Sequence, residues 1–193
     1  MIGNTIAAML GVTPPVISSY ESIATAVGTG SSGTITFSSI PATYTHLQLR
    51  WIAQDTRATY ADDDFNLRFN GDSSANYSWH NIYGNGASYN VYVGSSANLI
   101  VCRNGSGSTA ISTTMGVGII DILDYASTSK NKTTRFIGGD DVNGTVAGYG
   151  GNAVFGSGQW LNSSTAINSI SITNGQLINW TTLTSISLYG IKG

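Results

Sequence analysis

Apolar and polar residues alternate with a period of two along most of this chain, and a period of 3.6 is almost absent. Strict alternation is the pattern of a strand with one buried and one wet face. It is clearest in residues 46–53 and 65–70. Similar patterns predict strands at 20–27, 33–37, 77–83, 89–93, 99–103, 116–125, 133–138, 167–173 and 184–191. The chain is therefore predicted to be all-β.

Asn-Gly pairs recur between the predicted strands. Both residues tolerate the positive φ that tight hairpin turns require, so each pair predicts a reversal. The pairs are Asn70-Gly71, Asn85-Gly86, Asn104-Gly105, Asn143-Gly144 and Asn174-Gly175. Many short strands with such turns, and no crossover helices, predict an antiparallel β-sandwich of jelly-roll type over residues 18–193.

Charged residues make up only 9% of the chain, and Ser, Thr, Asn and Gly supply close to half of it. A net charge of −2 with eight Lys and Arg argues against a nucleic-acid partner held by phosphate neutralisation. The longest apolar stretch is well short of the roughly 18 residues that span a bilayer, so no membrane insertion is predicted. Edge strands with few charges do little to deter pairing with other chains, and oligomerisation or docking would cover them.

Residues 1–17 have a different pattern. Ile2, Ile6, Met9 and Leu10 would share one face of a short helix, and two prolines follow at 14 and 15. Such a helix is too short to be stable alone in water. We expect an N-terminal docking arm that orders when its apolar face meets a partner. The alternative is a flap folded back on its own sandwich.

Few residue patterns in the chain suggest chemistry. The glycine-rich stretch 28–33 leads into a strand instead of the helix that a dinucleotide site needs, so it is predicted to be a hairpin loop. His46 and His80 are expected on outward strand faces, without zinc-ligand spacing. Cys102 lies in an apolar run and is expected to be buried. No catalytic, metal or cofactor residue is therefore predicted, and a hydrolase is disfavoured because no nucleophile-elbow motif joins a strand to a helix.

Three acidic clusters could attract a cation. They are Asp62-Asp63-Asp64, the pair Asp121 and Asp124, and Asp140-Asp141 ahead of Asn143-Gly144. None supplies the distal bidentate carboxylate of a calcium loop. Solvated loops are the favoured interpretation, and structural calcium is the alternative.

Four tryptophans could be core residues or recognition platforms. Trp51 and Trp79 are in phase with apolar neighbours and are expected in the core. Trp160 and Trp180 lie in Ser-, Asn- and Gly-rich surroundings, which makes them the better candidates for exposed recognition aromatics. Packing in the core is nevertheless the favoured interpretation for both.

Several segments resemble a family of tailed-bacteriophage virion proteins, from about residue 18 to the C-terminus. The most specific is FSSIPATYTHLQLRW at 37–51; the others are YESIAT at 20–25, RFNGD at 68–72 with NYS at 76–78, and SLYGIKG at 187–193. The resemblance implies a structural component of the virion, assembled in the host cytoplasm. It brings no catalytic residues.

The family includes structural, decoration and tail proteins, so two functions are expected. In the first, the chain is a capsid decoration or cement protein that docks on the shell through its N-terminal arm. In the second, it is a tail or head-fibre adhesin that binds host-surface glycan. The expected partners are capsid or tail proteins and further copies of the chain itself, which we expect to form a homotrimer.

Overall fold

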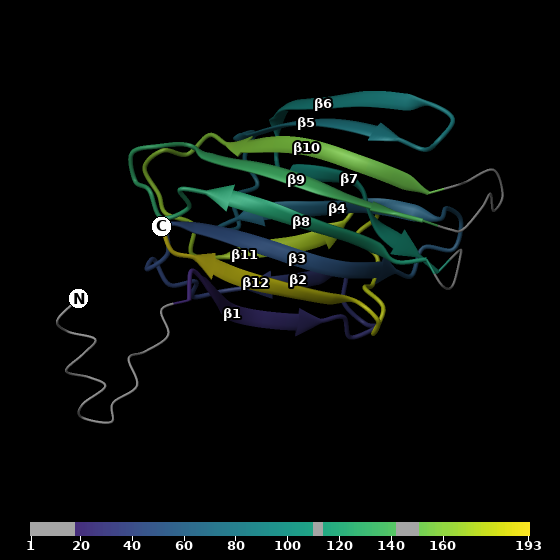
Figure 1. The fold of residues 1–193 in the computed structure, drawn as a ribbon, viewed down its shortest axis with the longest axis horizontal. Helices are drawn as coiled ribbons and strands as arrows, with labels where there is room; N and C mark the ends of the chain where they lie inside the picture. The colour runs from purple at the N-terminus through teal and green to yellow at the C-terminus, as the bar shows by residue number, and fades with distance from the viewer. Residues whose placement is uncertain (1–17, 110–113, 142–150) are drawn as a thin grey trace, which may run out of the picture.

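The computed structural model describes residues 18–109, 114–141 and 151–193, and these ranges contain strands and loops but no helix (Figure 1). In chain order the strands are β1 (Tyr20–Val27), β2 (Thr34–Phe37), β3 (His46–Asp55), β4 (Asp62–Phe69), β5 (Tyr77–Gly84), β6 (Tyr89–Ala97), β7 (Ile100–Ser108), β8 (Gly116–Leu123), β9 (Lys132–Asp140), β10 (Asn152–Trp160), β11 (Ile170–Asn174) and β12 (Ser185–Ile191). The all-β prediction is confirmed.

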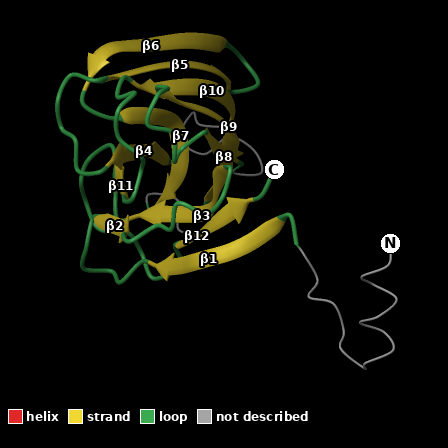
Figure 2. Ribbon diagram, turned by 90° about the vertical axis from the view of Figure 1, so that its left-hand side faces the viewer, coloured by secondary structure: helices red, strands yellow, loops and turns green. Residues whose placement is uncertain are grey.

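The strands form two antiparallel layers. The larger sheet has the order β1-β12-β3-β8-β9-β10-β5-β6, and the smaller has the order β2-β11-β4-β7. They join at one end, where Gln54 and Asp55 of β3 run parallel to Gly107 and Ser108 of β7. Figure 2 shows the larger sheet curving from β6 through β8 to β1 around the smaller one.

The chain alternates between the two sheets from β1 to β4 and again from β10 to β12. As a result, β1-β12-β3-β8 lies against β2-β11-β4-β7 as two nested four-stranded layers, which is the strand order expected of a jelly roll. The strand pairs β9–β10 and β5–β6 extend the larger sheet beyond this unit. The sandwich is thus the observed architecture, and the jelly-roll type stays an inference from strand order.

Aromatic side chains fill the space between the sheets. The rings of Trp51 on β3 and Phe65 on β4 stack with centroids 4.1 Å apart and planes 7° from parallel. Trp180 packs against the same Phe65 ring at 6.0 Å. The indole N–H of Trp51 donates to the carbonyl oxygen of Gly105 at 2.6 Å, so its buried polar group is satisfied. This cluster therefore fastens β3 of one sheet to β4 and β7 of the other.

Strand β10 is the one strand of the described residues that the sequence pattern did not predict. Its inward-facing positions are Val154, Gly156, Gly158 and Trp160. A side chain at Gly156 would overlap the Phe136 ring, and one at Gly158 would overlap Ile100. The side chains of Phe136 and Ile100 on neighbouring strands fill the space beside these glycines. The sequence of β10 therefore lacks the alternating large apolar residues that would predict a strand.

The Asn-Gly predictions are only partly right. Asn85-Gly86 joins the paired strands β5 and β6, as predicted. Asn70-Gly71 has positive φ at both residues, 52° and 67°, but the turn leads from one sheet to the other. The prediction for Asn104-Gly105 is wrong, because the pair lies inside β7 beside a register shift. Asn174-Gly175 follows β11 and also leads to the other sheet, and Asn143-Gly144 lies outside the described residues.

The predicted hairpin at residues 28–33 is wrong as well. These residues connect β1 of the larger sheet to β2 of the smaller one. Gly28 and Gly33 lie so close to the carbonyl groups of Thr181 and Ile178 that neither position has room for a side chain. Glycine is needed here for close packing against the β11–β12 connection.

Gly118→Ala is predicted to lower the free energy of unfolding by about 1–3 kcal/mol, because the new methyl group overlaps the buried Trp51 ring. Urea denaturation measures the change. Gly84→Ala is the control, since its methyl group would meet only the Ser88 carbonyl oxygen at 3.8 Å. Equal stability of the two variants would contradict the tight fit of Trp51.

Candidate functional site

A row of exposed apolar side chains crosses the outer face of the larger sheet. The row is Ile119 (β8), Ile137 (β9), Phe155 (β10), Ile82 (β5) and Val91 (β6), each a direct cross-strand partner of the next. Ile137 is 62% exposed and Phe155 58%. The alternate positions of β8, β9 and β10 hold Ile120, Phe136 and Val154, which are buried in the core, so these three strands carry apolar side chains on both faces. Such strands normally carry another layer on each side.

Further apolar side chains widen this row. Ile52 and Val117 pair with each other on one side of it, and Val93 lies beside Val91 on the other, opposite His80. All three are exposed. We call these eight residues the apolar face: Ile52, Ile82, Val91, Val93, Val117, Ile119, Ile137 and Phe155.

A polar flank borders the apolar face. Asp121 accepts hydrogen bonds from Gln48 at 2.7 Å and from the Arg135 guanidinium at 3.1 Å. Arg50, the cross-strand partner of Ile119, donates to Gln48 and lies 5.3 Å from the ring centroids of Tyr20 and Tyr189. The charges of the flank are thus held by neighbours, and the apolar side chains remain open to solvent.

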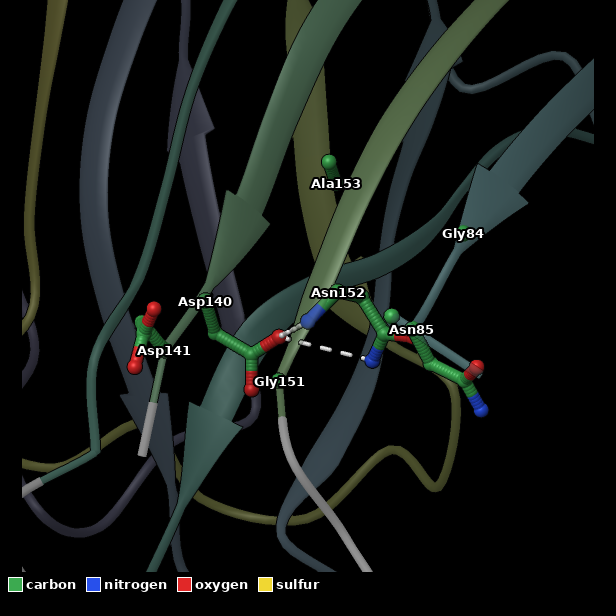
Figure 3. A pocket seen from close by; sticks show the side chains of 8 residues that line it. Gly84, Asn85, Asp140, Asp141, Gly151, Asn152 and Ala153 are labelled. Carbon is green, nitrogen blue, oxygen red and sulfur yellow. Dashed lines mark hydrogen bonds between the residues drawn. The ribbon is translucent and has the colours of Figure 1, made fainter. Parts of the chain in front are cut away.

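A second candidate is a polar pocket at the end of the sheet where β9 and β10 meet β5 (Figure 3). The Asn152 backbone N–H donates to Asp140 Oδ1 at 3.0 Å. Its side-chain amide contacts the same oxygen at 3.4 Å and donates to Asp62 Oδ2 at 3.2 Å. Asn85 lines the other wall. The arrangement offers carboxylate and amide groups that can hydrogen-bond a hydroxyl-rich ligand.

The aspartates that form three clusters in the sequence are separated in the structure and have different partners. Asn152 links Asp62 of the first cluster to Asp140 of the third, whereas Asp63 lies 3.5 Å from Arg57 and Asp64 lies 3.3 Å from Arg103. Asp121 and Asp124 pair with Arg135 and Lys130. Within the described residues, no group of three or more His, Cys, Asp or Glu side chains is arranged to hold a metal ion.

Trp160 and Trp180 are wrong as candidates for exposed recognition residues, and the favoured interpretation, packing in the core, is confirmed. Trp160 is 1% exposed and Trp180 is completely buried. Trp160 packs between Phe69 and Tyr77, and Trp180 packs against Phe65. Their polar sequence neighbours alternate outward or lie in loops, while folding brings aromatic residues from distant strands to the indole rings.

Trp160 is anchored by Asp72 at the edge of the core. Its indole N–H donates to Asp72 Oδ2 at 2.8 Å, and the side chain of Asn76 donates to the same oxygen at 3.0 Å. These two hydrogen bonds lower the pKa of Asp72 to about 2, and the bond from Asn76 has the larger effect. The carboxylate holds the loop after β4 against the core. This role is structural.

The other predicted residues have mixed outcomes. Cys102 is buried, as expected, and burial raises the pKa of its thiol. His80 is exposed, and half-buried His46 accepts a hydrogen bond from the Asp124 backbone N–H at 3.0 Å. The arm residues Ile2, Ile6, Met9 and Leu10 lie outside the described residues, so the docking arm stays a prediction.

The apolar face was not predicted from the sequence. Its only local signal is a run such as Gly118-Ile119-Ile120, or Phe136-Ile137, in which neighbouring positions are both apolar and therefore point to opposite faces. The register of six strands is needed to show that the outward members form one surface.

Comparisons with protein-family models and with curated proteins give no match to this chain. In the ranges that the structure describes, no helix is long and apolar enough to cross a membrane.

Asp72→Ala is predicted to lower the free energy of unfolding at pH 7 by about 1 kcal/mol, since Trp160 and Asn76 lose a charged acceptor at a partly exposed site. The folded-state pKa lies below the unfolded-state value, so the stabilisation is present above about pH 4 and is lost as the pH falls toward 2. Urea unfolding of both proteins across this range, with Ser73→Ala as the control from the same turn, measures it. A stability difference that stays constant down to pH 2 would show that the charge of Asp72 is irrelevant.

The Cys102 thiol is predicted to react with a disulfide reagent at pH 8 more than about 100-fold slower in the native chain than in urea, because it is buried and its pKa is raised. Absorbance of the released thiolate measures both rates. Rapid reaction of the native chain would refute the burial of this residue.

Proposed function

We propose that this chain is a non-enzymatic structural protein of a tailed-bacteriophage virion, and specifically a capsid decoration or cement protein. The observation that carries the proposal is the apolar face. Exposed apolar patches of more than a few hundred Å² on a soluble protein are typical of interaction surfaces. Here such a patch lies on a sheet whose charged neighbours are already paired. Binding to other protein surfaces is the activity that this arrangement serves best.

The composition supports the same proposal. Only 9% of the residues are charged, so a surface of neutral hydroxyl and amide groups can approach a neighbour of either sign without strong repulsion. A protein that binds only the assembled shell stabilises that shell by mass action. Many weak contacts suffice, since several copies on one lattice engage together. The resemblance of residues 37–51 and 187–193 to virion proteins points to a phage particle as the lattice.

In this proposal the N-terminal arm makes the contact with the shell, through Ile2, Ile6, Met9 and Leu10. The two-layered body carries the arm and remains at the particle surface. The jelly-roll strand order suits this role, because the two sheets share one apolar core that holds the body together.

The alternative is a tail or head-fibre adhesin that binds host-surface glycan. The polar pocket favours it, because exposed Asn85 and Asp141 present an amide and a carboxylate at one depression, whose floor is made of nearly buried Asp140 and Asn152. Tyr89, 80% exposed at the tip of the β5–β6 hairpin, is the cross-strand partner of the pocket residue Gly84. Carbohydrate recognition would then depend on these residues and not on Trp160 or Trp180.

The copy number of the chain in purified particles tests the proposal. Quantitative mass spectrometry against the major shell protein is expected to find hundreds of copies per particle for a decoration protein. A few dozen copies or fewer would support the fibre adhesin instead. Absence of the chain from particles that otherwise assemble would overturn both functions.

Deletion of residues 1–17 is predicted to abolish docking on shells that lack the protein, while the remaining chain keeps its fold. Co-sedimentation of the purified chain with the shells measures docking, and circular dichroism reports the fold. The full-length chain is the matched control. Undiminished co-sedimentation of the truncated chain would show that the arm does not make the contact.

A further inference from the structure

We propose that the apolar face is a self-association surface, on which a second copy of this chain packs face to face. The inference uses the same apolar face as the virion proposal, but its test uses the isolated protein and can fail without changing the copy number in particles. Its starting point is the unbroken pairing of exposed apolar residues from Ile119 on β8 to Val91 on β6.

The area of the face is the first argument. Eight apolar side chains that are between 37% and 63% exposed make up this face. At about 100 Å² each they present about 800 Å², which is one partner's share of a standard protein interface. The largest apolar patch on a typical monomer is smaller, about 300–600 Å². A second copy would shield a large part of this surface from water.

The chemistry of the face is the second argument. It is built from isoleucine, valine and one phenylalanine, with no charged side chain among its eight members. Interfaces between identical subunits are more apolar than those between proteins that meet transiently. A continuous aliphatic layer is therefore better matched by an identical layer than by the polar surface of an unrelated soluble protein.

Electrostatics and shape permit the pair. Asp121 and Arg135 on the polar flank carry opposite charges and bind each other, so the flank of each copy carries one net positive charge, that of Arg50, which contacts Gln48 and two tyrosine rings. The chain as a whole carries a charge of −2, and long-range repulsion between copies is small. Two sheet faces pack about 10 Å apart with interdigitating side chains. A two-fold arrangement lets the same patch serve both partners and closes the assembly at two copies, in place of the homotrimer expected from the sequence.

Analytical ultracentrifugation of the full-length chain at micromolar concentration is expected to give twice the mass of one chain, which is 20.2 kDa. Phe155→Asp, at the middle of the row, is expected to raise the dissociation constant by about 30-fold or more, because a carboxylate would be buried without a partner. Leu177→Asp is the matched control, since Leu177 is 70% exposed but lies on the β11–β12 connection. This control is expected to remain dimeric, and circular dichroism confirms the fold of both variants.

A second variant keeps the proposal testable if Phe155→Asp fails to fold. Phe155→Cys, treated with a short bis-maleimide, is expected to yield a covalent dimer, whereas Leu177→Cys is expected to yield none; buried Cys102 does not interfere. A monomeric full-length chain at 100 µM, a trimer, or a dimer unaffected by Phe155→Asp in a folded variant would overturn the proposal. Loss of the dimer on deletion of residues 1–17 alone would assign self-association to the arm and overturn it too. The particle copy number is unaffected by any of these results.

Discussion

The stack of Trp51 on Phe65 is the contact on which the rest of the structure depends. It joins β3, near the middle of the larger sheet, to β4 of the smaller one at a centroid distance of 4.1 Å. The indole fits only because Gly118, its cross-strand neighbour, has no side chain. Its N–H reaches the backbone of β7. Large rings from one strand thus occupy the space that glycines on the next strands leave empty, and Gly156 beside Phe136 repeats the arrangement.

A core completed in this way has a consequence for function. The inward positions of β8, β9 and β10 are already filled, so the isoleucines and the phenylalanine on their outer face contribute nothing to the core. Exposed side chains of this kind cost solubility unless a partner covers them. The few charges of the chain are meanwhile held as local pairs, such as Arg103 with Asp64 and Arg135 with Asp121. The outer face of the larger sheet is therefore the surface that we propose for self-association of the chain.

Local rules predicted some of the site residues and misplaced others. The burial of Cys102 follows from its apolar run, and the strand over Tyr20–Val27 has the bounds that alternation predicts. Trp160 and Trp180 were wrong candidates for an exposed face, because polar sequence neighbours say nothing about the aromatic residues that other strands bring to a side chain. The pocket around Asn152 was missed for the same reason: Asp62 and Asp140 belong to different sheets and are 78 positions apart.

The alternation along the chain by itself determined the all-β class and most of the strands, because a period of two is a local property that each segment carries alone. It could not determine which strands become neighbours. Asn104-Gly105 inside β7 and the glycine-rich strand β10 show this limit of local prediction. Their conformations depend on residues that are far away in the sequence. Only the tertiary structure decided that Ile119, Ile137, Phe155, Ile82 and Val91 form one row. Cross-strand register is set by pairing between distant segments, and a shift of one residue would have turned these side chains to the opposite face.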